Sequence, residues 1–474
     1  MFLTHRWLGV ALALIMALWT LSGIVMMYVS YPQTSRAERL AGLDALDLSA
    51  CCGQATPPDG PIDSVSVEML DGAPVLRWMT PEGPKLAPLS GGETPVVDEA
   101  LAARIAGTHY RNTLGSEAPV TVEPVEGDQW TVAVRRYAPL WKASFTDDRG
   151  TQLYVSGLTG QVVQDTHASE RFWSWLGAVP HWLYFRPLRE NGPLWSQIVI
   201  WSSLLGTFLT VTGIYIGLIT FRRRGRHSPF RGIALWHHWL GLIFGIVTLT
   251  WVFSGLASMN PWGWLESGGP GEEMQGMAGR SPEATDVGAL YRALAANPRP
   301  GVVSAELIVQ GSRPYAILVS ADGSPERASL PGLAPAPLAN GDLAALARMA
   351  KPGVSASQSL IAQGDSYHYT HHTGSPAVLP AWRVIYSDEA KTRLYLDPRT
   401  GELVGYADPA RRSFRWWHLA LHRLDFSFLR QRPLWDGVMI VLLVGVSLVC
   451  LLGVWMGVRR VRRDLGRLSR GRRK

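Results

Sequence analysis

The sequence has few cysteines and lacks the short motifs of nucleotide-dependent enzymes. Only Cys51, Cys52 and Cys450 occur among 474 residues, so no disulfide framework is predicted. The pattern C-x-x-C-H is absent, which argues against covalently attached c-type haem. No Gly-rich phosphate loop, no G-x-G-x-x-G after a strand and no H-E-x-x-H is present. The chain therefore carries no obvious nicotinamide or flavin site.

Adjacent cysteines rarely bridge to each other without strain. We therefore expect Cys51 and Cys52 to be packing residues or loose thiols. Cys450 lies in an apolar run and is expected to act as a small apolar side chain.

Acidic and basic residues are almost absent from four long apolar runs. Three runs have none, and the fourth has only Asp436 near its start. Each run is long enough for a helix that crosses a bilayer, which needs about 20 residues. The first is too long for a typical signal-peptide core, and no convincing cleavage site follows it. The runs are Trp7–Tyr31, Leu194–Phe221, Ala234–Asn260 and Leu434–Val458.

The net charge of +7 is concentrated in two short segments. The loop Phe221–Arg231 holds five arginines, and the tail Arg459–Lys474 holds nine basic residues. Such clusters next to membrane helices set topology, and we favour this interpretation over nucleic-acid binding. The sequence thus predicts a bacterial inner-membrane protein with both termini in the cytoplasm and two long segments facing the periplasm.

The chain contains an internal repeat. His5-Arg-Trp-Leu-Gly9 returns as His237-His-Trp-Leu-Gly241, and Ser22-Gly23 returns as Ser254-Gly255. Later matches, including Tyr154 with Tyr395 and Thr159-Gly160 with Thr400-Gly401, share an offset of 241. Each half is therefore predicted to run helix, outer domain, helix, with a pseudo-twofold axis along the membrane normal.

Both segments between the spans have the pattern of small α+β domains. The pairs Ser64–Leu70 with Ala73–Thr80 and Ser304–Gln310 with Tyr315–Ser320 are predicted hairpins. Val97–His109 and Asp342–Met349 have helical spacing, and later short strands follow in both halves. We divide the chain into helix 1 (1–32), outer domain 1 (33–169), an interfacial segment with helix 2 (170–221), a basic cytoplasmic loop (222–233), helix 3 (234–260), outer domain 2 (261–410), an interfacial segment with helix 4 (411–458) and a basic cytoplasmic tail (459–474).

These features resemble the PepSY-associated transmembrane family. The resemblance rests on the His-Arg-x-Leu-Gly helix, on the Leu-Tyr-x-x-x-x-Thr-Gly strand and turn, and on a histidine before the next helix. It implies a membrane helical bundle of four helices in two tandem repeats, with two extracytoplasmic PepSY-like domains. It also implies a redox role, because the family includes inner-membrane ferric-siderophore reductases and iron-regulated membrane proteins.

Four histidines form two candidate pairs for b-type haem, which helical bundles often bind through two facing imidazoles. By the repeat, His5 and His237 share one depth, and His181 and His422 share another at the opposite membrane face. One or two haems b are therefore expected. Gly9 and Gly241 follow one helical turn after His5 and His237, where a missing side chain would leave clearance for the macrocycle.

Other interpretations of these residues stay open. The glycines are also explained by close helix packing, and histidines at a membrane interface are common. The repeat alone favours His237 over its neighbour His238. His418 lies four residues before His422 and is either an alternative ligand or an interfacial side chain.

Two further groups are candidate binding residues. Arg171, Arg412 and Arg423 are candidates for holding haem propionates, although lipid phosphates would suit them equally. His368, His371 and His372 are candidate metal ligands, with structural histidines in a polar strand as the favoured alternative.

The first functional hypothesis is a haem-dependent reductase that passes electrons across the membrane to a ferric siderophore or another ferric chelate. Its electrons would come from a quinol, a partner protein or a reduced carrier. The alternative is a non-catalytic, membrane-anchored PepSY-type binding or regulatory protein. A transporter ranks third, because the membrane segments have almost no ionisable residue at mid-depth.

Overall fold

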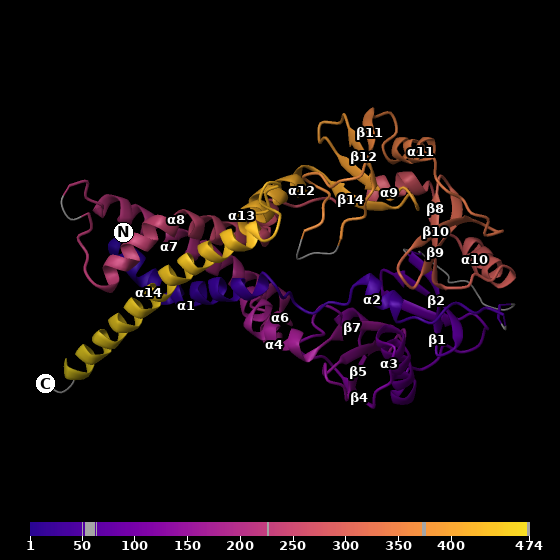
Figure 1. Ribbon diagram of the computed structural model, residues 1–474, viewed down its shortest axis with the longest axis horizontal. Helices are drawn as coiled ribbons and strands as arrows, with labels where there is room; N and C mark the ends of the chain where they lie inside the picture. Colours follow the sequence, from indigo (N-terminus) through magenta and orange to yellow (C-terminus); the bar gives the residue numbers. More distant parts are fainter. Residues whose placement is uncertain (50, 53–61, 63, 225–226, 372–375, 472–474) are drawn as a thin grey trace.

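The computed structural model describes residues 1–471 apart from 50, 53–61, 63, 225–226 and 372–375. A helical bundle occupies one end of the molecule and two outer domains occupy the other, with both termini at the bundle end (Figure 1). Among the described residues, four helices are long and apolar enough to cross a membrane. They are α1 (Phe2–Met26), α7 (Gly192–Thr220), α8 (Ile233–Ser258) and α14 (Leu434–Gly471).

The four helices form a closed ring in the order α1, α14, α8, α7, so α1 lies diagonal to α8. Met16, Trp251 and Val446 are among the residues that fill the centre. Leu14 and Ile243 stay more than half exposed on the outside, as expected for side chains that face lipid. The helix α14 continues through the basic tail to Gly471, an extension that the apolar run did not predict.

Each outer domain contains one four-stranded antiparallel sheet with its strands in chain order. The helix α3 (Glu99–Leu114) packs on the first sheet, and it begins where Asp98 accepts a hydrogen bond from the Leu101 amide. The helix α11 (Asn340–Ala350) contributes to the core on the second sheet. The strands are β4 (Val120–Val125), β5 (Leu140–Phe145), β6 (Gln152–Ser156) and β7 (Val162–Thr166), and then β11 (Ala356–Ile361), β12 (Ala381–Tyr386), β13 (Arg393–Leu396) and β14 (Leu403–Ala407).

A six-stranded sheet joins the two domains, because β1 of the first pairs antiparallel with β8 of the second. Val65 lies opposite Leu307, and Val67 lies opposite Ala305. At the joint, fully buried Glu68 accepts a hydrogen bond from Ser304 of the second domain at 3.3 Å, and Arg77 and Arg39 contact the same carboxylate at 2.6 and 2.8 Å. The strands are β1 (Ser64–Leu70), β2 (Ala73–Thr80), β3 (Gly83–Pro88), β8 (Val302–Gln310), β9 (Arg313–Ser320) and β10 (Pro325–Ser329).

Short helices connect the outer domains to the bundle. In the first half these pack on the end of α1, and in the second half a π-helical turn and α13 pack on α8. They are α4 (Ala168–Leu176), α5 (Ala178–Trp182) and α6 (Arg186–Arg189), then α12 (Pro409–Phe414), the π-helical turn Arg415–Ala420 and α13 (Leu421–Arg423). The remaining helices are α2 (Arg36–Ala41), α9 (Gly271–Ala278) and α10 (Ala284–Ala296), with 3₁₀ turns at Arg135–Tyr137 and Pro261–Gly263.

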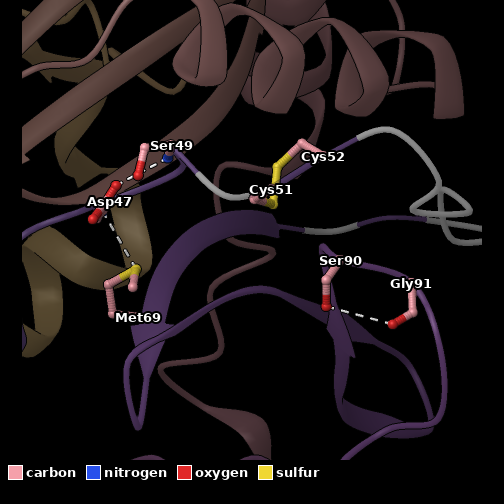
Figure 2. Close-up of a disulfide and its surroundings, with 7 residues drawn as sticks. All are labelled: Asp47, Ser49, Cys51, Cys52, Met69, Ser90 and Gly91. Atoms are coloured by element: carbon pink, nitrogen blue, oxygen red, sulfur yellow. Dashed lines mark hydrogen bonds between the residues drawn. A yellow bond between two sulfur atoms is a disulfide. The ribbon is translucent and has the colours of Figure 1, made fainter.

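Cys51 and Cys52 form a disulfide with each other, so the expectation of packing residues or loose thiols was wrong (Figure 2). The link closes between neighbouring residues with Cys52 at a positive φ of 92°. Both residues are half-buried against the apolar core under the six-stranded sheet. Cys450 is a free, buried thiol in α14, as expected.

Candidate functional site

The structure brings His5 and His237 together near the end of the bundle that lies away from the outer domains. His5 comes from α1 and His237 from the diagonal helix α8, and their ring centres are 6.4 Å apart. Both rings are half-buried inside the ring of helices. We call these residues the inner pair.

His181 and His422 form a second pair, the outer pair, at the domain end of the bundle. Their ring centres are 6.0 Å apart with an interplanar angle of 70°. His181 lies on α5 against the end of α1, and His422 lies on α13 against the end of α8. Seventeen residues separate His5 from Ser22, which contacts His181, so about 25 Å of helix rise lies between the pairs.

Each of the four imidazoles is oriented by a backbone carbonyl at its Nδ1. His5 bonds the carbonyl of Leu209 and His237 that of Val449, both at 3.1 Å. An Nδ1–H that donates to a carbonyl leaves Nε2 unprotonated, with its lone pair available to a metal. The outer pair repeats this arrangement: the carbonyls of Trp19 and Trp251 lie at 2.9 and 3.3 Å, and the hydroxyls of Ser22 and Ser254 lie at 3.2 and 3.0 Å.

Glycines make room for the four rings. A Cβ on Gly213 would lie 2.7 Å from Cε1 of His5, and one on Gly453 would lie 3.6 Å from Cε1 of His237. In the outer pair, Gly23 and Gly255 lie against the rings in the same way, at 3.6 and 3.9 Å. Each histidine therefore packs against a position with no side chain.

The two glycines expected to clear a macrocycle face open space. A Cβ on Gly241 would meet no protein atom within 4 Å, and one on Gly9 would meet only Leu209 at 4.0 Å. Close helix packing does explain Gly245 and Gly217, where a Cβ would approach Ile214 and Leu242 to 2.9 Å. Close packing is thus seen at Gly245 and Gly217, and clearance for a macrocycle at Gly9 and Gly241 stays a prediction.

Strained backbone follows both outer histidines. Leu183 and Leu424, each two residues after a histidine, adopt left-handed φ values of 52° and 48°. A non-glycine residue in this region costs about 1 kcal/mol or more and often marks a functional site. Both leucines end the short helix that carries the histidine.

Of the two adjacent histidines on α8, only His237 faces His5. His238 points to α7, where its Nε2 lies 3.0 Å from the carbonyl of Gly217 and 3.2 Å from Thr220. His418 joins the outer pair from the side: its ring centre lies 5.0 Å from that of His422, and its Nδ1 lies 2.9 Å from the Ser254 carbonyl. The geometry therefore favours His237 over His238 and leaves His418 as a neighbour of the outer pair.

The spacing within each pair suits one metal ion between two imidazoles. A metal–imidazole bond is about 2 Å long, so two rings bound to opposite sides of one ion have centres about 6 Å apart. The observed 6.4 and 6.0 Å agree with this value. Paired imidazoles whose Nδ1 atoms bond to carbonyls are also the donor set that b-type haem takes.

The structure gives two of the predicted propionate arginines other partners. Arg171 donates to the carbonyls of Thr166 and Gly150, and Arg412 donates to those of Lys391 and Ala390. Both guanidinium groups therefore hold turns of the outer domains through their Nη1 and Nη2 donors. Arg423 lies next to the outer pair, close enough for its charge to act on His181 and His422.

The predicted metal-binding histidines that the structure describes, His368 and His371, contact different neighbours. His368 is buried, stacks on Tyr395 at 4.6 Å and contacts the Val378 carbonyl at 2.9 Å, whereas the ring of His371 lies 6.4 Å from that of Trp435. His372 lies outside the described residues. Across the described chain, no group of three His, Cys, Asp or Glu side chains is placed to hold a metal ion.

A cleft of about 700 Å³ lies between the outer domains on one face of the six-stranded sheet. Basic side chains on its wall include Arg36, Arg39, Arg77, Lys85 and Arg136, and acidic ones include Glu68, Glu306 and Glu402. Burial raises the pKa of Glu402, and the negative charge of Glu306 adds to the effect. Sequence patterns gave no indication of this cleft, because it forms only when β1 and β8 pair.

Sequence reasoning named the four histidines but missed the groups that orient them. Ser22, Ser254, Gly213 and Gly453 were visible only as matches between the two halves. The carbonyls that accept from Nδ1 have no sequence signal, since every residue carries one.

Comparison with known proteins gives one family. The family model described as PepSY-associated TM region matches residues 2–329, which is more than half of the chain. The match runs from α1 through α8 to the end of β10. No curated protein matches the chain.

Proposed function

The chain belongs to the PepSY-associated TM region family, and on this premise we propose that it is a haem-dependent redox protein of the bacterial inner membrane. The observation that carries the proposal is that two pairs of imidazoles lie at the two ends of one membrane bundle. The ring centres are 6.4 Å apart in the inner pair and 6.0 Å apart in the outer pair. Two sites so placed would connect the two faces of the membrane. Haem b supplies one-electron redox chemistry when bound to such ligands.

The residues of the chain have defined tasks in this proposal. His5 and His237 hold the inner group, and His181 and His422 hold the outer one. The carbonyl acceptors at each Nδ1 fix the ring orientation and keep Nε2 unprotonated. The apolar bundle keeps water and other ions away from both sites, so that electrons pass without side reactions.

We further propose that the chain consists of two tandem copies of one unit. The matched hydrogen bonds of Asp147 with Thr151 and of Asp388 with Thr392 support this, as do those of Arg171 and Arg412. In this arrangement both termini are cytoplasmic and the outer domains face the periplasm, since the basic loop and tail lie at the bundle end (Figure 1).

The proposed acceptor is a ferric siderophore or another ferric chelate on the periplasmic side. Adding one electron to Fe(III) gives Fe(II), which hard oxygen ligands bind less strongly, so the chelate releases its iron. The proposed electron donor is a quinol or a redox protein. The wall of the cleft between the outer domains carries five basic and three acidic side chains, and this excess of positive charge suits an anionic chelate.

A spectrum of the purified protein tests this function. We expect a bis-histidine α-band in the reduced-minus-oxidised spectrum after haem-replete expression, with up to two haems per chain. His237→Ala should remove one haem and His422→Ala the other. His238→Ala is the matched control and should keep both, because His238 contacts α7 instead. A wild-type protein without the α-band contradicts the proposal.

The cleft also favours one alternative, a membrane-anchored protein of the PepSY type that binds a ligand without catalysis. Its volume of about 700 Å³ is that of a small-molecule site. In that case, alanine at both His5 and His237 would leave function intact in cells.

A further inference from the structure

A group of charged side chains lies beside the outer pair, in the second half of the chain only. Asp425 is 1% exposed and receives hydrogen bonds from Tyr369 and, at 2.5 Å, from Arg430. Arg415 approaches the same carboxylate at 3.6 Å. Burial alone would raise the pKa of Asp425, but Tyr369, Arg430 and Arg415 hold it below its usual value. The carboxylate is therefore ionised.

Three arginines face this single carboxylate. Arg415 is 4% exposed. Arg423 directly follows His422 in the chain, and its charge interacts with Asp425 and with the outer pair. Arg430 stacks on Tyr369 at 3.5 Å. The group thus carries a net charge of about two positive units, and burying such a charge without a counter-ion is costly.

One donor in this group lacks an acceptor. The Nε of Arg415 donates to the Ser366 carbonyl at 3.0 Å, and its Nη2 to the Asp425 carbonyl. Its Nη1 is buried and has no hydrogen-bond partner among the described residues. A buried guanidinium N–H normally finds an acceptor, most often a carboxylate or phosphate.

The first half of the chain keeps only one member of this group. By the offset of 241, Ser174, Trp182 and Tyr184 take the positions of Arg415, Arg423 and Asp425, and Arg189 takes that of Arg430. Aromatic rings fill that region instead, with Tyr184 packed on Tyr31 and on Trp195. Arg189 lies over the rings of Tyr184 and Trp195, so the buried carboxylate and its two further arginines occur on one side of the outer pair only.

We propose that Arg415, Arg423 and Arg430 bind the two propionate carboxylates of the outer haem. This inference rests on the proposed function. Two carboxylates balance the net charge of the group, and one of them supplies an acceptor for Nη1 of Arg415. Arg423 was already a candidate from the sequence, whereas Arg415 and Arg430 take the places of Arg171 and Arg412, which hold backbone carbonyls.

The test measures loss of haem from the outer site to an excess of apomyoglobin. The full chain carries His237→Ala, so that only the outer pair is loaded. Arg415→Gln and Arg430→Gln should each speed haem loss about 10- to 100-fold, because each removes a charge-assisted hydrogen bond. The midpoint potential should also fall, since a positive charge near the haem is lost. Arg411→Gln is the matched control and should change neither quantity, because exposed Arg411 only overlies Tyr406.

A second arm replaces haem by its dimethyl ester, whose propionates carry no charge. With the ester, wild-type and variant proteins should lose the cofactor at rates within about twofold, since the arginines no longer have carboxylates to bind. Equal fold-changes with haem and with the ester would overturn the inference, as would an Arg415→Gln protein that loses haem at the wild-type rate. Should Arg415→Gln fail to fold, Arg415→Lys and Arg423→Gln give the same comparison. A wild-type chain that binds no haem refutes the proposed function itself.

Discussion

Replacing Gly213 by alanine should damage the inner pair, whereas the equivalent change at Gly453 should be tolerated. The new Cβ at position 213 would lie 2.7 Å from Cε1 and 3.3 Å from Nδ1 of His5. Ordinary carbon contacts need about 3.5–4.0 Å, so the ring must retreat from α7 by about 1 Å. The Leu209 carbonyl that orients the ring lies on the same helix and is already 3.1 Å from Nδ1. The retreat therefore breaks this hydrogen bond.

Two costs follow from this displacement. Overpacking of a filled interior destabilises the bundle by about 1–3 kcal/mol. Loss of the group that orients a metal-binding histidine lowers metal affinity by about 10- to 100-fold. At Gly453 the Cβ would lie 3.6 Å from His237, which is an ordinary contact, so neither cost arises.

The assay is the haem content and the reduced-minus-oxidised spectrum of the two variants, with a thermal melt of each. We expect Gly213→Ala to lose most of one haem and Gly453→Ala to keep both. Equal haem content in the two variants would refute the reasoning, because it would mean that the ring of His5 adapts without losing its function.

Three further predictions concern other sites. Gly241→Leu should lower haem content. It should not lower the melting temperature of the haem-free protein, since a Cβ there meets no protein atom within 4 Å. Unchanged haem uptake would mean that Gly241 does not provide clearance for the macrocycle. Glu68→Gln should lower the free energy of unfolding in urea by about 3–5 kcal/mol, because it leaves buried Arg77 without its carboxylate. Glu306→Gln should change it by less than about 1 kcal/mol, because the arginine partner of Glu306 is 57% exposed. Burial opposes ionisation of Asp388, but its hydrogen bonds, the first from a lysine, lower its pKa to about 2. The stabilisation that ionised Asp388 gives the fold is therefore complete above pH about 5 and disappears as the pH falls toward 2. Asp388→Asn should lower the free energy of unfolding by up to about 2 kcal/mol at neutral pH. Urea titrations at several pH values should also show a weaker dependence of stability on pH in this variant.

The parts of the fold with a strong local pattern could be predicted from the sequence. Four apolar runs gave four helices, and Asp71-Gly72 gave the turn between β1 and β2. The strands β4 and β11 were missed. Both are partly exposed edge strands, the first is interrupted by Pro124, and the second begins with small or polar residues. Pairing of β1 with β8 also escaped prediction, since it joins residues about 240 positions apart and leaves no local signal.

The candidate site could also be predicted only in part. The repeat identified the four histidines, because equivalent positions in two copies have equal depth. It favoured His237 over His238, and the structure shows the physical difference, which is the helix that each histidine faces. It also assigned Arg171 and Arg412 to the membrane surface, although their guanidinium groups turn toward carbonyls of the outer domains. Side-chain direction depends on tertiary contacts, which a spacing argument does not contain.

The two diagonal helices α1 and α8 tie the inner and outer pairs to one frame. The helix α1 carries His5 near one end, and at the other end it presents the carbonyl of Trp19 that orients His181. The helix α8 does the same with His237 and with the carbonyl of Trp251 that orients His422. A tilt of α1 relative to α8 therefore changes the separation of both imidazole pairs at once. In the proposed function, such a frame would hold the two pairs of histidines in a fixed relation to each other while electrons pass between them.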